Sequence, residues 1–169
     1  MTNLGFPLPR KGARFAVFSW LAICLVTTAG LSQQAAPDLS GTWKLNVKDS
    51  KQGAIRGSVV LEIKQSGSVL NMRHRYASGD NRVFSYTVDG KEHVADFTKD
   101  GVTMAKTYWE GDTLVVENHN HDNNRSFVAD TYFNCRYSLS ADQKSLVVSM
   151  RGMRPPVSDL HAELVYQRQ

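Results

Sequence analysis

Cysteine is scarce in this chain of 169 residues, which holds one at position 24 and one at position 135. Cys24 lies in an N-terminal apolar run that we expect to be removed, so Cys135 would remain alone. An internal disulfide is then excluded, although small exported domains often depend on one. The remaining chain of about 137 residues must be stabilised by a hydrophobic core, and that length buries roughly two thirds of the unfolded surface.

An excess of charge of one sign is also missing once the N-terminus is set aside. The whole chain has 20 Lys and Arg against 16 Asp and Glu, and three of the positive side chains are Arg10, Lys11 and Arg14. Residues 33–169 therefore hold 17 basic and 16 acidic side chains. Nucleic-acid binding depends on a clustered positive field, so this near neutrality argues against a nucleic-acid partner.

The N-terminus has the pattern of an export signal. Three basic residues precede the apolar run Phe15–Leu31, and small residues follow near Gly30–Ser32. This order is typical of a secretory signal peptide, so we expect residues 1–32 to be cleaved and the protein to be secreted or periplasmic, with membrane contact only through this segment. An uncleaved anchor is the alternative, because the run approaches the roughly 17 residues that span a bilayer. Ile23 before Cys24 argues against a lipoprotein.

Helical periodicity is absent from the rest of the chain, where apolar residues recur with period two. Leu61 and Ile63, for example, alternate with Glu62 and Lys64. Such alternation places the apolar side chains on one face of a strand. We expect a linker over 33–40, a single β domain over 41–169, and ten strands at 43–47, 61–64, 70–76, 84–88, 94–97, 102–109, 114–118, 126–139, 146–150 and 160–168.

Short turns such as Ser66–Ser68, Asp89-Gly90 and Asp100-Gly101 separate these strands. Short connections join antiparallel neighbours, and a long meander usually closes so that no edge strand stays unpaired. We therefore expect an all-β, up-and-down meander barrel of about 8–10 strands, with an open sandwich as the alternative. The longer loop Asp49–Gly57 is placed to cover a barrel mouth.

Two short motifs carry a family resemblance. Gly41-Thr42-Trp43-Lys44-Leu45 on the first strand and Tyr166-Gln167-Arg168-Gln169 at the C-terminus together resemble the lipocalin-like, or calycin, barrels. The stretch from Asp38 to Asn46, with the same C-terminus, also resembles a group of small secreted bacterial proteins. The resemblance implies that Gly41, Trp43 and Arg168 form a structural motif across the closed barrel end, with the guanidinium within about 6 Å of the indole ring.

The sequence departs from this family in two ways. The paired helices that cover the fatty-acid-binding branch are absent, and so are the disulfides common in secreted lipocalins. Nitrobindin-like barrels of the same superfamily hold haem through a C-terminal histidine, which would correspond to His161. The glycines that follow the Trp in that branch are missing here, so a surface histidine beside Glu163 is the preferred interpretation.

His119 and His121 are the candidate metal ligands. Residues two apart on a strand share a face, and two imidazoles on one face can hold a metal ion, with Glu117 on the same side. The cluster also runs into the polar turn Asp122–Asn124, and no third ligand is identifiable. A metal- or haem-binding barrel is therefore a distant alternative, and no cofactor is expected.

Catalytic motifs are missing as well. The sequence has no Gly-x-Ser-x-Gly elbow and no Cys–His signature around Cys135, which shares a strand face with Phe133 and Tyr137 and is expected to be buried and inert. We expect a non-enzymatic barrel that binds a small hydrophobic or amphipathic molecule. Its candidate cavity residues are apolar or phenolic: Met72, Tyr76, Phe84, Tyr86, Met104, Tyr108 and Phe127.

The alternative is a solid barrel whose outer surface binds an envelope protein, because side chains fill narrow barrels completely. An internal void above about 300 Å³, the lower end for ligand pockets, distinguishes the two hypotheses.

Overall fold

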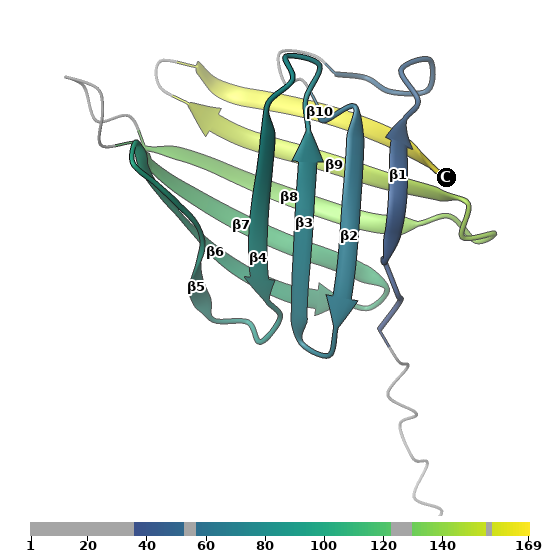
Figure 1. Cartoon of the computed structure of the whole chain (residues 1–169), viewed down its shortest axis with the longest axis horizontal. Coiled ribbons are helices and arrows are strands. Elements are labelled where there is room, and N and C mark those ends of the chain that lie inside the picture. Colours follow the sequence, from purple (N-terminus) through teal and green to yellow (C-terminus); the bar gives the residue numbers. More distant parts are fainter. Residues whose placement is uncertain (1–35, 53–56, 123–129, 155–156) are drawn as a thin grey trace, which may run out of the picture. The chain divides into compact units, whose positions relative to one another are not determined.

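The computed structural model describes residues 36–52, 57–122, 130–154 and 157–169. Within them the chain is all β, with ten antiparallel strands in one sheet (Figure 1): β1 Gly41–Leu45, β2 Val60–Ser66, β3 Val69–Arg75, β4 Asn81–Thr87, β5 Glu92–Thr98, β6 Gly101–Glu110, β7 Thr113–Asp122, β8 Thr131–Leu139, β9 Ser145–Arg154 and β10 Val157–Arg168. Among these residues, no helix is long and apolar enough to cross a bilayer.

Each predicted strand corresponds to an observed one. The predicted strand over 126–139 is observed from Thr131, and its first residues lie outside the described ranges, as do Asn123 and Asn124 of the predicted turn. The predicted signal peptide and most of the linker also lie outside them. The all-β meander predicted from the period-two pattern is confirmed.

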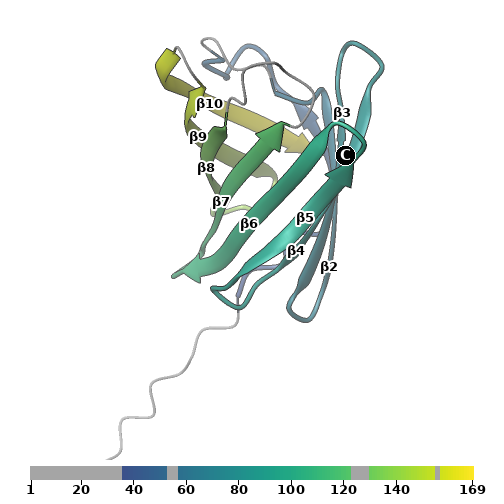
Figure 2. The same cartoon turned by 90° about the vertical axis from the view of Figure 1, so that its left-hand side faces the viewer.

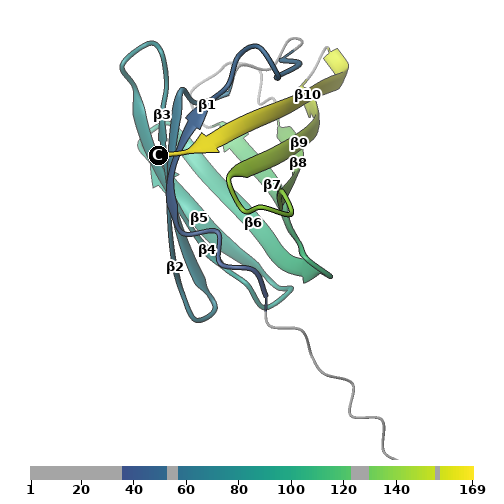
Figure 3. The same ribbon diagram turned by 90° about the vertical axis from the view of Figure 1, so that its right-hand side faces the viewer.

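Pairing of the first and last strands joins the two ends of the meander. Trp43 of β1 is opposite Arg168 of β10, and Leu45 is opposite Tyr166. The sheet order is β4-β3-β2-β1-β10-β9-β8-β7-β6-β5. Figure 3 shows β1 and β10 side by side, where the layer of β1–β4 turns into the layer of β6–β10. The result is a nearly closed barrel.

The barrel is not fully closed, because β4 and β5 are the two edges of the sheet. The expectation that neither edge stays unpaired is therefore wrong at this seam. The chain leaving β4 bonds to β6, since Val88 forms an isolated bridge with Thr107 and the Gly90 amide donates to the Thr107 carbonyl oxygen at 3.0 Å. Turn residues bound to β6 cannot form a tight hairpin, so β5 diverges from β4 (Figure 2).

The core fills one end of the barrel. Its fully buried side chains are apolar and come from both layers: Leu39, Trp43, Ile63, Leu70, Met72, Leu114, Val116 and Leu146. At the other end lie the β3–β4 hairpin and the loop between β1 and β2 (Figure 1). This division places any internal space near that second end.

Candidate functional site

The motif of Gly41, Trp43 and Arg168 lies at the β1–β10 junction. Trp43 is fully buried, its Nε1–H donates to the Leu39 carbonyl oxygen at 3.0 Å, and the Arg168 guanidinium carbon lies 4.3 Å from the ring centroid. The predicted contact of less than 6 Å is therefore present. Arg168 also donates to the backbone carbonyls of Ser40 and Gln143, at 3.0 and 3.1 Å.

Gly41 is required by this arrangement for two reasons. Its φ of +146° is one that residues with a side chain rarely adopt. A Cβ atom at this position would also lie 3.1 Å from Arg168 Nη1. Glycine therefore lets the first strand pass beneath the guanidinium.

An internal chamber of about 240 Å³ lies between the filled core and the hairpin end. We call it the chamber. Its lining is mostly aromatic and apolar, with several polar groups: Gly57, Ser58, Leu61, His74, Tyr76, Arg82, Phe84, Tyr86, Asn118, Asn120, Phe133, Cys135, Tyr137, Val148, Met150, Leu164 and Tyr166. The barrel is therefore not completely filled. The chamber alone does not meet the criterion of about 300 Å³ that distinguishes a ligand pocket from a solid barrel.

A second pocket of about 800 Å³ lies at the barrel mouth, and we call it the vestibule. Its lining comes from the end of β1, the following loop and the β3–β4 hairpin, and includes Leu45, Gln52 and Asn81. Gly57, Tyr76 and Arg82 line both the vestibule and the chamber, so the two spaces share a rim. Gln52 and Gly57 belong to the loop predicted to cover a mouth, whose residues 53–56 are outside the described ranges.

The predicted cavity residues divide into four groups. Tyr76, Phe84 and Tyr86 line the chamber as predicted. Met72 points into the barrel but is fully buried in the filled core, away from the chamber lining. Phe127 lies outside the described residues.

Met104 and Tyr108 lie on the outer face, which corrects their prediction. On β6 the inward side chains are Thr103, Ala105 and Thr107, which are all buried. The Tyr108 hydroxyl donates to Glu117 Oε1 at 2.9 Å on the outside of the sheet. Alternation shows which residues share a face but not which face is inside, and on β6 the small side chains are inside.

Burial keeps the chamber's phenols neutral. Desolvation raises the pKa of Tyr76, and it raises those of Tyr86 and Tyr137 well above the ordinary value of 10. It also raises the pKa of Tyr166 to about 12, although a hydrogen bond with Ser58 opposes the shift. At neutral pH these hydroxyls are uncharged hydrogen-bonding groups.

His74 is the least expected member of the lining. Its ring stacks on Tyr76 at 6.2 Å and meets Phe84 edge-on at 5.3 Å between centroids. Desolvation first, and then the positive charge of Arg82, lower the pKa of His74 from 6.5 to about 4. The imidazole is therefore neutral at physiological pH.

Asn118, Asn120 and Tyr137 were also absent from the predicted site. They could have been found by extending the period-two pattern, because Asn118 and Asn120 share the face of the buried Leu114 and Val116. Polar residues near the end of a strand favoured a solvated turn. In the structure β7 continues past them, and the Asn120 side chain lines the chamber.

Cys135 lines the chamber as a buried free thiol. Desolvation raises its pKa from 9.0 to about 12, against hydrogen bonds from Tyr137 and Asn118 that favour the thiolate. Since the thiolate is the reactive form, the predicted inert state is supported.

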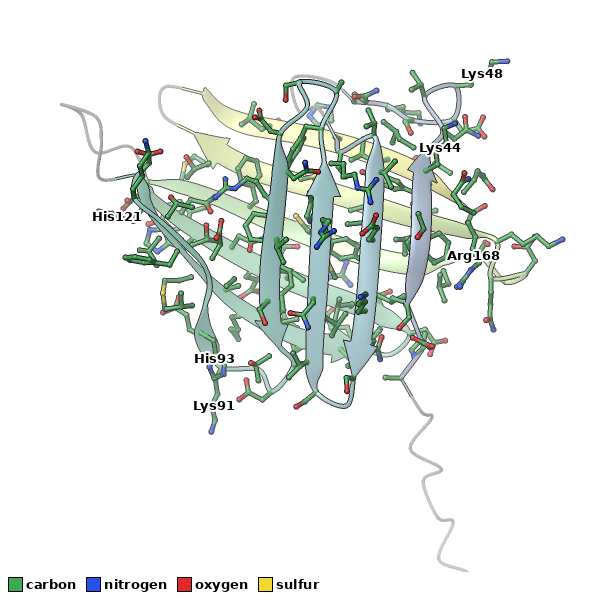
Figure 4. The ribbon with its side chains drawn as sticks, viewed as in Figure 1. Lys44, Lys48, Lys91, His93, His121 and Arg168 are labelled. Carbon is green, nitrogen blue, oxygen red and sulfur yellow. The ribbon has the colours of Figure 1, made fainter. Side chains whose placement is uncertain are left out.

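His119 and His121 lie on the outer face of β7, and Figure 4 shows His121 at the opposite side of the view from Arg168. His121 Nδ1 lies 2.9 Å from Asp130 Oδ1, and His119 Nε2 lies 3.4 Å from Asp130 Oδ2. Asp130 was not predicted as a partner of the two histidines, because seven residues separate it from β7. In the described part of the chain, no group of three potential ligands is arranged to hold a metal ion.

His161 is exposed on the outer face of β10, between the half-buried Leu160 and the buried Ala162. It is paired in register with Arg151 and shares its face with the exposed Glu163. This position agrees with the preferred interpretation of a surface histidine and does not face the chamber.

Comparison with known proteins identifies the fold. No protein-family model matches the sequence, and no curated protein matches it. Among solved structures, a secretary abundant heat soluble protein from Ramazzottius varieornatus superposes with a TM-score of 0.57 at 12% identity, covering 78% of this chain and 95% of that one. Human cRBP IV gives 0.54 at 17% identity, with 79% and 99% covered.

The zebrafish ileal bile acid-binding protein, solved with cholic acid, gives a TM-score of 0.53 at 15% identity and covers 77% of this chain and 98% of its own. Each match extends over nearly the whole of the other protein. At these identities the likeness concerns the fold alone, and with the β1–β10 junction it shows that the chain folds as a nearly closed antiparallel meander barrel like those of these proteins.

Proposed function

We propose that this chain is an exported, non-enzymatic barrel that binds a small hydrophobic or amphipathic molecule. The observation that carries the proposal is the aromatic-lined chamber of about 240 Å³, which shares a rim with the vestibule at the barrel mouth. Ligand pockets combine an apolar lining with a few placed polar groups, as this lining does.

The two volumes limit how the ligand is held. The chamber alone falls below about 300 Å³, and the vestibule of about 800 Å³ exceeds it. We therefore place a compact apolar group in the chamber, with any larger or more polar part extending past Gly57, Tyr76 and Arg82 into the vestibule.

Two further points support binding without chemistry. The zebrafish barrel of the same fold was solved with cholic acid, an amphipathic molecule. In this chain, His74, the phenols and the Cys135 thiol line the chamber in their uncharged forms at neutral pH, because burial shifts each pKa toward the neutral species. A histidine with a pKa of about 4 is a weak base, and neutral thiols and phenols are weak nucleophiles, which favours binding without chemistry.

The experiment is native mass spectrometry of protein recovered from the medium or envelope fraction. A species heavier than the bare chain, whose excess mass is lost on denaturation, is the expected result. Val148→Phe places a ring in the chamber and should abolish this species. Val83→Phe makes the same change at a side chain that is 49% exposed on the outside, and it should leave the species intact.

If the wild type and the Val83→Phe variant are both recovered without ligand, and added amphipathic compounds do not bind to them, the proposal is overturned. Circular dichroism of both variants confirms that each is folded.

A second candidate function, binding an envelope protein, is favoured by an outer row of apolar side chains. Val94, Met104, His119, Tyr132 and Met153 are opposite one another in register across β5–β9. Val94, Tyr132 and Met153 are between 42% and 55% exposed, and such rows mark interaction surfaces. Tyr132→Lys should abolish cross-linking to an envelope component if this candidate holds, and leave ligand mass unchanged.

A further inference from the structure

Two polar atoms of the chamber lining have no hydrogen-bond partner in the described structure. They are Nε2 of His74, on β3, and Oδ1 of Asn118, on β7, and both are buried. Two other polar groups of the lining are satisfied: Asn120 Oδ1 accepts from Thr103 at 2.6 Å, and Tyr166 shares a bond with Ser58 at 3.2 Å. Leaving a buried polar atom unpaired is unfavourable, so such atoms in a cavity indicate a missing partner.

The chemistry of the two atoms defines that partner. Asn118 lines the chamber, and the Oδ1 atom of its amide can only accept a hydrogen bond. This buried atom has no partner in the described structure and requires a donor. Neutral His74 presents Nε2 as either an N–H donor or a bare acceptor, depending on the tautomer. A hydroxyl group both donates and accepts, so it suits each of these atoms.

The charges around the chamber argue against an ionised ligand there. Arg82 is the cationic side chain of the described lining, and Asp96 Oδ2 already lies 2.5 Å from its Nη2. A carboxylate inside would find no cation other than Arg82 in the described lining, and an ammonium group would face neutral phenols. Burying an unpaired charge is far more costly than burying a hydroxyl.

Water is the competing occupant. At about 30 Å³ per molecule, the chamber has the volume of about eight waters. A purely apolar molecule that displaces them leaves His74 and Asn118 unpaired, whereas a hydroxyl compound replaces their hydrogen bonds.

We propose that the chamber selects an uncharged hydroxyl compound on a compact aromatic frame, with its hydroxyl bound by His74 and Asn118. This inference rests on the proposed binding function and adds the chemical class of the ligand. It also assigns a selective role to two side chains that the aromatic pattern did not indicate.

The test compares 2-naphthol with 2-methylnaphthalene, in which a methyl group replaces the hydroxyl on the same frame. Isothermal titration calorimetry on the full chain should give about tenfold or more tighter binding for 2-naphthol. Asn118→Leu and His74→Phe should each reduce this preference to about threefold or less, while 2-methylnaphthalene binds as well as before.

Asn134→Leu is the matched control, since it makes the same change on the outward side of β8 and should keep the preference. A readout without substitution is the ¹⁵N shift of the His74 imidazole, which 2-naphthol should move and 2-methylnaphthalene should not. Equal affinity of the two compounds, or an unchanged preference in both variants, overturns the hydroxyl assignment alone. If neither compound binds and no native ligand is found, the proposed binding function fails with it.

Discussion

The indole ring of Trp43 connects the first strand, β1, to the last strand, β10. Its N–H group bonds to Leu39, and its face receives the Arg168 guanidinium from the last strand. The ring is fully buried, so its removal leaves a cavity and also exposes a cation–π partner. Stability at this residue therefore depends on aromatic packing more than on charge.

Trp43→Ala should lower the free energy of unfolding by about 3–5 kcal/mol, the range for truncating a buried aromatic. Arg168→Ala should lower it by less, since the cation–π contact contributes about 0.5–2 kcal/mol. Urea unfolding followed by circular dichroism measures both values. Trp43→Phe is the control that keeps a ring, and its free energy of unfolding should lie between those of Trp43→Ala and wild type. A Trp43→Ala protein as stable as wild type would contradict the assigned role.

His74 should make stability depend on pH. Burial lowers its pKa from 6.5 to about 4, so below pH 6.5 the unfolded chain takes up a proton that the folded chain resists. Its contribution is fully present above pH 6.5 and is lost as the pH falls toward 4. The loss is on the order of 3 kcal/mol at 1.36 kcal/mol per pKa unit.

Urea unfolding at pH 7.5, 5.5 and 4.5 measures this dependence. His74→Phe should flatten the slope between pH 6.5 and 4 relative to wild type, because the remaining carboxylates titrate equally in both proteins. His161→Phe, at an exposed histidine on β10, is the control and should keep the wild-type slope. The interpretation is wrong if the two variants behave alike.

Among the elements, β4 and β5 are consecutive strands that are not joined by a ladder of backbone hydrogen bonds, and the seam between them is the open edge of the barrel. The Arg82–Asp96 ion pair spans this seam at 2.5 Å, and the Asp96 side chain is only 15% exposed. Edge strands expose unpaired backbone groups and open more readily than central ones. The ion pair therefore replaces part of the missing hydrogen bonding.

Arg82→Gln should increase amide hydrogen exchange in β4 and β5 while leaving the β1–β10 junction unchanged. Arg136→Gln is the control, because it removes a comparable 2.7 Å pair to Glu110 between strands that β7 already connects by hydrogen bonds. Exchange that rises equally over all ten strands in Arg82→Gln would indicate global destabilisation instead.

For the whole molecule, export is the property that the N-terminal sequence predicts. We expect protein recovered from the medium or envelope to begin near residues 31–33, because small residues end the apolar run there. Intact-mass measurement and N-terminal sequencing test this. A retained Met1 in the envelope would indicate an anchor, and protein confined to the cytosol would exclude export.

The sequence was sufficient for the strands and the closing contact. Period-two alternation and the short turns predicted ten strands, and the Trp43 and Arg168 motifs predicted which two strands meet. These features depend on local stereochemistry and on residues whose pairing a meander requires. The strands could be predicted because alternation and turns rest on neighbouring positions in the chain. The contact between Trp43 and Arg168 joins distant positions, and the resemblance to calycin barrels implied it.

Which face of each strand is inside, and how much space remains, was decided by the tertiary structure. Met104 and Tyr108 lie outside because β6 turns Thr103 and Ala105 inward, and the β4–β5 seam stays open because Thr107 binds the turn after β4. His74 and Asn118 are 44 residues apart in the sequence, and both line the chamber. Strand alternation cannot specify such placements, because curvature and register across the whole sheet determine them.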